Sequence, residues 1–176
     1  MTNPMPPPMP PLMTEPSAGP VAPIRRTVTV EASIERAFSV FTAKMSLWWP
    51  REHHIGASPL LECVIEPQVG GRWYEVCDDG SQCQWGKVLT WSPPEHLVLA
   101  WQLDSQFAYD AALVTEVEVR FTALGPRRTQ VDFEHRNLER LGAAAVATRG
   151  AMDQGWAGIL HLYTASASEL ELAPGA

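Results

Sequence analysis

The segment SLWWPREHHIG, residues 46–56, places two adjacent tryptophans beside two adjacent histidines. Histidine can bind metal ions or transfer protons near neutral pH, and tryptophan supplies a large apolar contact area. Neighbouring side chains diverge in an extended loop, so His53 and His54 are poorly placed to share one metal ion. Glu62 and Cys63 are the nearest further ligands, and no HxH or HxxxH spacing occurs. We therefore expect no metal site and no bound cofactor.

A second candidate for chemistry is His135, which lies in the alternating segment 129–137. Val131, Phe133 and His135 share one face of this expected strand, and the acidic residues between them share the other. An inward histidine could orient a ligand, act as an acid or base, or be a core residue bonded to a backbone carbonyl. Glu75 could lie on either face of its strand, so the sequence gives His135 no carboxylate partner. We name no catalytic residue, and enzymatic activity stays open.

Composition limits the class of protein. The chain has 176 residues, 45% of them hydrophobic, and a formal net charge of −7. These values predict one globular domain and argue against nucleic-acid binding, which needs a basic surface. No run approaches the roughly 20 apolar residues of a membrane-spanning helix. The start of the chain does not resemble a signal peptide, and three cysteines form no CxxC pattern, so we expect a cytoplasmic protein with free thiols.

The first 23 residues are dense in proline, which removes backbone donors and disfavours helices and central strands. We expect residues 1–23 to be a disordered proline-rich tail and residues 24–172 to form a single domain.

Hydrophobic periodicity predicts the elements that must position these residues. Residues 24–32 alternate as a strand, Ser33 suits a helix N-cap, and the helical spacing that follows stops at Pro50. Six further strand-like segments follow, at 60–67, 71–77, 82–91, 96–103, 115–124 and 129–137. Residues 141–172 carry an apolar stripe at helical spacing, and two glycines within it are expected to allow close approach of a neighbouring backbone or ring.

These elements predict an α+β fold. A curved antiparallel sheet of about six or seven strands grips one long C-terminal helix, and two short helices follow the first strand.

Five segments carry a resemblance to a known family: EASIERAFSVFT, VGGRWYE, WGKVLTWSPPEHLVLAW, TQVDFEHRNLE and DQGWAGILHLYTAS. In this order they resemble the helix-grip, START-like (SRPBCC) superfamily. Within it they are similar to the branch of the C-terminal domain of the activator of the heat-shock-protein-90 ATPase. The resemblance covers about residues 24–172. It implies the helix-grip fold but not one function, because this superfamily contains carriers, cyclases, oxygenase domains and co-chaperone modules.

The resemblance also implies an apolar cleft between the sheet and the long helix, with the short helix and histidine loop at its open end. One of the paired tryptophans would cover the cavity, and the histidine loop would form its polar rim. Seven tryptophans are a large number for this length, and either a bulky aromatic core or a partly open aromatic pocket would account for them. The expected ligand-binding residues are Trp48, Trp49, Trp101, Phe133, His135, Met152 and Trp156.

We therefore expect a domain that binds a small apolar or amphipathic molecule. One alternative is a co-chaperone that binds a chaperone through its outer surfaces, with its interior packed shut. The eukaryotic co-chaperone has a separate N-terminal domain, whereas this chain has only the proline-rich tail. Another alternative is an enzyme of the polyketide cyclase or dehydratase type that depends on His135. A homodimer is compatible with the resemblance.

Overall fold

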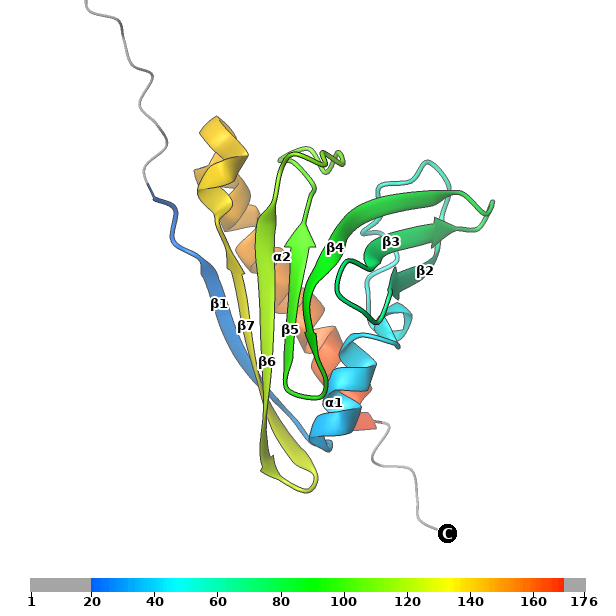
Figure 1. Ribbon diagram of the computed structural model, residues 1–176, viewed down its shortest axis with the longest axis vertical. Helices are drawn as coiled ribbons and strands as arrows, with labels where there is room; N and C mark the ends of the chain where they lie inside the picture. The colour runs from blue at the N-terminus through cyan, green and yellow to red at the C-terminus, as the bar shows by residue number, and fades with distance from the viewer. Residues whose placement is uncertain (1–19, 170–176) are drawn as a thin grey trace, which may run out of the picture.

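The computed structural model describes residues 20–169. The chain begins with β1 (Ile24–Val30), α1 (Ile34–Phe41) and the short 3-10 helix η1 (Met45–Leu47). Six strands follow: β2 (Leu60–Ile65), β3 (Arg72–Cys77), β4 (Gln82–Ser92), β5 (His96–Trp101), β6 (Thr115–Gly125) and β7 (Arg128–Arg136). The 3-10 segment η2 (Leu138–Ala144) then leads into the long helix α2 (Ala145–Glu169) (Figure 1).

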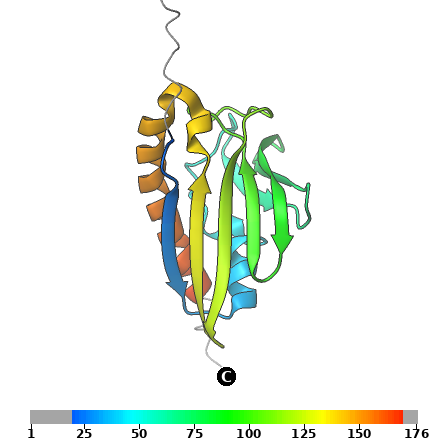
Figure 2. The same cartoon turned by 60° about the vertical axis from the view of Figure 1, so that its left-hand side comes forward.

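The seven strands form one antiparallel sheet in the order β1-β7-β6-β5-β4-β3-β2. The first strand pairs with the last, with Ile24 opposite His135 and Val30 opposite Thr129. Because β1 and β2 occupy opposite edges, the segment between them, which contains α1, crosses the open face of the sheet. Figure 2 shows the strands side by side in front of the two helices. This arrangement is the expected helix-grip fold.

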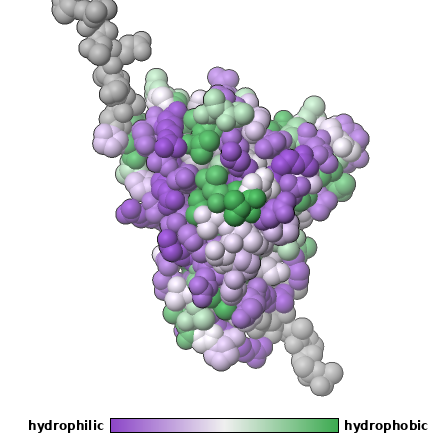
Figure 3. All heavy atoms as spheres, in the orientation of Figure 1, coloured by the Kyte–Doolittle hydropathy of each residue, from purple (hydrophilic) through white to green (hydrophobic). Residues whose placement is uncertain are grey.

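Local sequence explains most of these elements. In β7, Thr129, Val131, Phe133 and His135 are all buried, which confirms the predicted two-residue period. The N-terminus of α1 is capped by the Ser33 hydroxyl, which accepts a hydrogen bond from the Arg36 amide at 3.2 Å. On the face seen in Figure 3, polar side chains surround a central apolar patch.

The half of the sheet formed by β2, β3 and β4 bends away from the other half (Figure 1). Register shifts interrupt the pairing of β2 with β3, of β3 with β4 and of β4 with β5. Such bulges increase the local bend and twist of a strand. Beside one of them, Gly86 lies so close to the Ala100 carbonyl that any Cβ would overlap it. The bend therefore depends on a glycine at this position.

Helix α2 packs its backbone against β1 and α1 rather than against the centre of the sheet. Near its start, Arg26 of β1 and Asp153 form an ion pair at 2.9 Å. Near its end, the Tyr163 hydroxyl donates a hydrogen bond of 2.7 Å to the Ala37 carbonyl of α1. The helix is thus fixed along one edge of the sheet, and side chains must fill the space between it and β4 and β5.

Close approach of a neighbour to Gly155 and Gly158, two of the glycines of α2, was expected but does not occur, because an added Cβ at either position would have nothing within 4 Å. Segment η2 was not predicted; left-handed backbone at Asn137 (φ 64°) and Gly142 (φ 74°) separates it from regular helix. Residues 1–19 of the proline-rich tail lie outside the described residues. No helix among residues 20–169 is long and apolar enough to cross a membrane.

Candidate functional site

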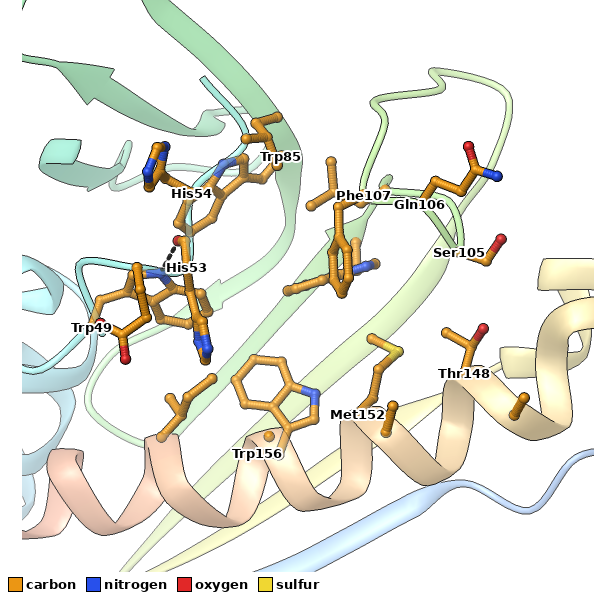
Figure 4. A pocket seen from close by; sticks show the side chains of 18 residues that line it. Trp49, His53, His54, Trp85, Ser105, Gln106, Phe107, Thr148, Met152 and Trp156 are labelled. Carbon is orange, nitrogen blue, oxygen red and sulfur yellow. Dashed lines mark hydrogen bonds between the residues drawn. The ribbon is translucent and has the colours of Figure 1, made fainter. Parts of the chain in front are cut away.

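A cavity of about 740 Å³ lies between the N-terminal half of α2 and the bent part of the sheet. Its apolar wall comes from elements that are distant in sequence, namely the segment after η1, strands β4 and β5, and helix α2 (Figure 4). This wall consists mainly of Trp49, Trp85, Trp101, Met152, Trp156 and Ile159. Two loops complete the mouth: residues 52–55 on one side and residues 105–107 on the other.

Four indole rings make the wall continuous. The ring centroid of Trp49 lies 5.0 Å from that of Trp85 and 6.0 Å from that of Trp156. The centroids of Trp101 and Trp156 are 5.7 Å apart, with the rings inclined at 64°. Inclined rings of this kind pack edge to face, which is a favourable arrangement for aromatic pairs. They also fill space less completely than aliphatic side chains, and the remaining space is the cavity.

Three of these indoles are held by hydrogen bonds from their N–H groups. Trp49 donates to the His53 carbonyl at 2.8 Å, and Trp85 donates to the Glu75 carboxylate at 2.9 Å. Trp156 donates to Nδ1 of His135 at 3.2 Å. Fixing the polar edge of each ring fixes its orientation, so the apolar wall is ordered before any ligand enters.

The ring of His135 is completely buried, and its hydrogen bonds define its tautomer. An indole N–H can only donate, so Nδ1 of His135 must accept the bond from Trp156. The proton of the neutral ring is therefore on Nε2, which donates to the Thr115 hydroxyl at 2.8 Å. That hydroxyl donates in turn to the Trp101 carbonyl at 3.2 Å. Burial lowers the pKa of His135 to about 3, so the ring is neutral at physiological pH.

The rim loop, residues 52–56, forms one side of the mouth. It contains both histidines of the SLWWPREHHIG segment, and Figure 4 shows His53 extending toward Trp156. Nδ1 of His54 lies 2.9 Å from the Gly56 carbonyl and donates to it. The amide of Ile55 donates to Glu75 at 2.6 Å, which joins this loop to β3.

The outer loop, residues 104–112, forms the opposite side. Phe107 has φ 60°, is 51% exposed and lies across the cavity from Trp49 in Figure 4. The Asp104 carboxylate accepts hydrogen bonds from the amides of Gln106 at 2.8 Å and Ala108 at 2.9 Å. This loop is thus organised largely by its own short-range hydrogen bonds, and its aromatic side chain is only half covered.

The structure divides the sequence-predicted site residues into two groups. Trp49, Trp101, Met152 and Trp156 line the cavity. Trp48, Phe133 and His135 are buried behind the wall instead. Trp48 donates to the Val40 carbonyl at 2.8 Å and packs on Phe41 and Tyr163. Phe133 packs on Trp156 with ring centroids 4.5 Å apart.

Sequence reasoning missed several residues that line the cavity, notably Trp85, Ile55 and Phe107. Trp85 carried a usable signal, since it is a tryptophan near the middle of a predicted strand. Phe107 lies in the segment DSQFAYDAA between two predicted strands, and the two aromatic residues of this otherwise polar segment are a signal that it covers something. Ile55 directly follows the two histidines, in the loop that the family resemblance places at the open end of the cleft.

The polar groups that reach the cavity belong to its mouth and to the start of α2. They are Glu52, His53, His54, Ser105, Gln106 and Thr148. Within residues 20–169, no three His, Cys, Asp or Glu side chains are grouped to bind a metal ion. The site is therefore an apolar aromatic chamber with hydrogen-bonding groups around its entrance.

Comparisons with known proteins agree with this architecture. The sequence profile described as "Activator of Hsp90 ATPase homolog 1-like protein" matches residues 31–164. The chain belongs to this family. Its fold is the START-like, helix-grip fold, and no curated protein matches the chain.

Two solved structures are similar in both sequence and fold. An anthrahydroquino-γ-pyrone synthase, Txn09, is 34% identical over 82% of this chain and 96% of its own, with a TM-score of 0.60. The self-sacrificing resistance protein CalC from Micromonospora echinospora is 30% identical over 86% of this chain and 97% of its own, with a TM-score of 0.65. The Aha1 dimer from Colwellia psychrerythraea shares the fold at 15% identity, with a TM-score of 0.59, over 84% of this chain and 97% of its own.

The neutral, buried state of His135 predicts a dependence of stability on pH. The unfolded chain binds a proton at this histidine near pH 6.5, whereas the folded chain does so only near pH 3. As pH falls through this window, protonation favours the unfolded chain by up to about 1.4 kcal/mol per pH unit. The free energy of unfolding of wild type and of His135→Gln can be measured with urea between pH 7 and pH 4.5. Its change with pH should be less steep in the variant, by the equivalent of about one proton. The exposed His161, changed to Gln, is the control and should keep the wild-type slope; an equal slope in His135→Gln would contradict the assignment.

Trp156 and Phe107 should differ sharply in their contribution to stability, although both line the cavity. Trp156 is 3% exposed and also packs on the core, so Trp156→Ala should lower the free energy of unfolding by about 3–5 kcal/mol. Phe107 is half exposed, so Phe107→Ala should change it by only about 0.5 kcal/mol. Urea unfolding measures both values. A large loss in Phe107→Ala would mean that the outer loop is packed into the core.

Proposed function

We propose that this protein binds a planar, mainly apolar small molecule of several fused rings, with polar substituents at its edge, in the cavity beneath α2. The observation that carries the proposal is the chamber of about 740 Å³ with four indole rings in its wall. Pockets for small molecules commonly have volumes of about 300–1,000 Å³ and are lined by apolar and aromatic side chains with a few polar groups.

The shape of the wall favours a flat ligand. Indole faces offer broad surfaces on which another aromatic ring can stack or pack by its edge. The polar groups lie around the mouth, where His53, Ser105 and Gln106 can hydrogen-bond to oxygen atoms at the outer edge of a ligand. A wholly apolar ligand would leave these groups hydrated, whereas an amphipathic one would use them.

The names of the two related proteins are consistent with this ligand class. One is a synthase named for an anthrahydroquino-γ-pyrone, a fused-ring product, and the other is a resistance protein. Catalysis through His135 is not part of the proposal, because both ring nitrogens are engaged and the ring lies behind Trp156. The open chamber also differs from the closed interior that we expect of the alternative function, a co-chaperone that binds its partner only through its outer surfaces.

Binding can be tested with anthraquinone-2-sulfonate, a soluble three-ring probe, by titration against tryptophan fluorescence. Gly155 lines the cavity and an added Cβ there meets no atom within 4 Å, so the side chain of Gly155→Leu would occupy the chamber. We expect wild type to bind with quenching and Gly155→Leu to bind at least tenfold more weakly.

Gly158→Leu is the matched control. It lies on the same helix, is exposed and also meets no atom within 4 Å at Cβ. Both substitutions remove a helix glycine and should stabilise α2 by a similar amount, about 0.8 kcal/mol. Only Gly155→Leu should weaken binding. Equal effects of the two variants, or no binding of the probe by wild type, would contradict the proposed function.

A further inference from the structure

Glu75 is a carboxylate with no exposed surface, at the centre of strand β3. Burying an ionised carboxylate is costly unless hydrogen bonds or opposite charges compensate for the lost water. Among the described residues, His54 places Nδ1 4.0 Å from Oε2, but this nitrogen already donates to the Gly56 carbonyl, and the Cys77 thiol donates to Oε2 at 3.7 Å. The carboxylate is therefore held mainly by N–H donors, and the identity of those donors gives its role.

Three N–H groups converge on one oxygen of Glu75. Oε1 accepts from the Ile55 amide at 2.6 Å, the Gly56 amide at 3.3 Å and the Trp85 indole at 2.9 Å. Ile55 and Trp85 both line the cavity, one from the rim loop and the other from β4. A single buried atom thus connects the mouth of the cavity to its aromatic wall.

The middle of the rim loop has few other attachments to the domain. Before it, the His53 carbonyl accepts from Trp49, and after it, the Pro59 carbonyl accepts from the Asp78 amide. After the loop, the Ser58 hydroxyl also donates to the Asp79 carboxylate at 2.8 Å. Within the described structure, the hydrogen bond of residues 54–56 that does not involve Glu75 joins His54 to Gly56 inside the loop. Glu75 therefore supplies the link from residues 54–56 to the sheet.

The fit of the loop against β3 is close. A Cβ on Gly56 would overlap the Sγ atom of Cys77 and come within 3.5 Å of Oε2 of Glu75. Only a residue without a side chain allows the amides of Ile55 and Gly56 to reach the carboxylate. Gly56 and Glu75 are thus two parts of one attachment.

We infer that Glu75 is a positioning residue for ligand retention: by fixing the rim loop and the Trp85 ring together, it keeps the mouth closed around a bound molecule and sets the rate at which that molecule leaves. This inference rests on the proposed function for its ligand. The attachment itself can be measured without a ligand.

The test compares Glu75→Leu, which removes the acceptor, with Glu75→Gln, which retains an acceptor oxygen in a side chain of the same shape. Two readouts need no ligand: hydrogen exchange at the Ile55 and Gly56 amides, and exchange at the Trp85 indole N–H, both by NMR. The third is the dissociation rate of anthraquinone-2-sulfonate by stopped-flow fluorescence. Glu62→Leu, an exposed substitution on the adjacent strand β2, is the control.

For Glu75→Leu we expect exchange at least tenfold faster at all three N–H groups and probe dissociation at least tenfold faster. Glu75→Gln and the control should stay within about threefold of wild type in dissociation rate. If Glu75→Leu does not fold, Gly56→Ala provides the second variant, because it displaces the loop while leaving the carboxylate in place; it should accelerate both amide exchange and dissociation.

Unchanged exchange in a folded Glu75→Leu, or faster exchange with an unchanged dissociation rate, would overturn the inference. If the wild type fails to bind the probe, the proposed function fails and the retention role fails with it. The exchange measurements would then still establish whether the attachment exists, so the two failures are distinguishable.

Discussion

The hydrogen bond between the indole of Trp156 and the buried ring of His135 joins the long helix to the floor of the sheet. It fixes the orientation of the Trp156 ring between α2 and β7. The bond requires a neutral histidine, and burial provides that state by lowering its pKa to about 3. The Thr115 hydroxyl and the Trp101 carbonyl complete the chain, so no polar atom of this set is left without a partner. The bond thus fixes Trp156 as part of the cavity wall.

The same principle recurs around the chamber. Trp49, Trp85 and Trp156 each direct their one polar group to an acceptor of the protein: a carbonyl, a carboxylate and an imidazole nitrogen. Their rings are therefore fixed, and their apolar surfaces form an ordered wall. An ordered wall loses little conformational entropy on binding, which favours affinity. The two loops at the mouth differ in how they are held: the rim loop is joined to a buried carboxylate, whereas the outer loop depends on its own short-range hydrogen bonds.

The sequence predicted the fold well because two-residue periods specify β6 and β7, a strong helical period specifies α1, and each segment of the family resemblance lies on a core element. Of the seven site residues named from the sequence, Trp49, Trp101, Met152 and Trp156 line the cavity. The alternation of β5 and the apolar stripe of α2 place Trp101 and Trp156 inward. Periodicity cannot decide which of two adjacent tryptophans turns toward the cavity, and Trp48 is the one that packs into the core. It also fails at β3 and β4, where bulges shift the register, and this left the face of Glu75 open.

The central claim is that a ligand enters the chamber between α2 and the sheet, and 19F NMR of 5-fluorotryptophan-labelled protein tests it most directly. The seven tryptophans give seven resonances, assigned by single Trp→Phe variants. Titration with anthraquinone-2-sulfonate should produce the largest shifts at Trp49, Trp85, Trp101 and Trp156, which line the cavity. Trp48, Trp73 and Trp91 should shift less. Shifts of equal size at all seven positions, or the largest shifts at Trp48, Trp73 and Trp91, would contradict the account.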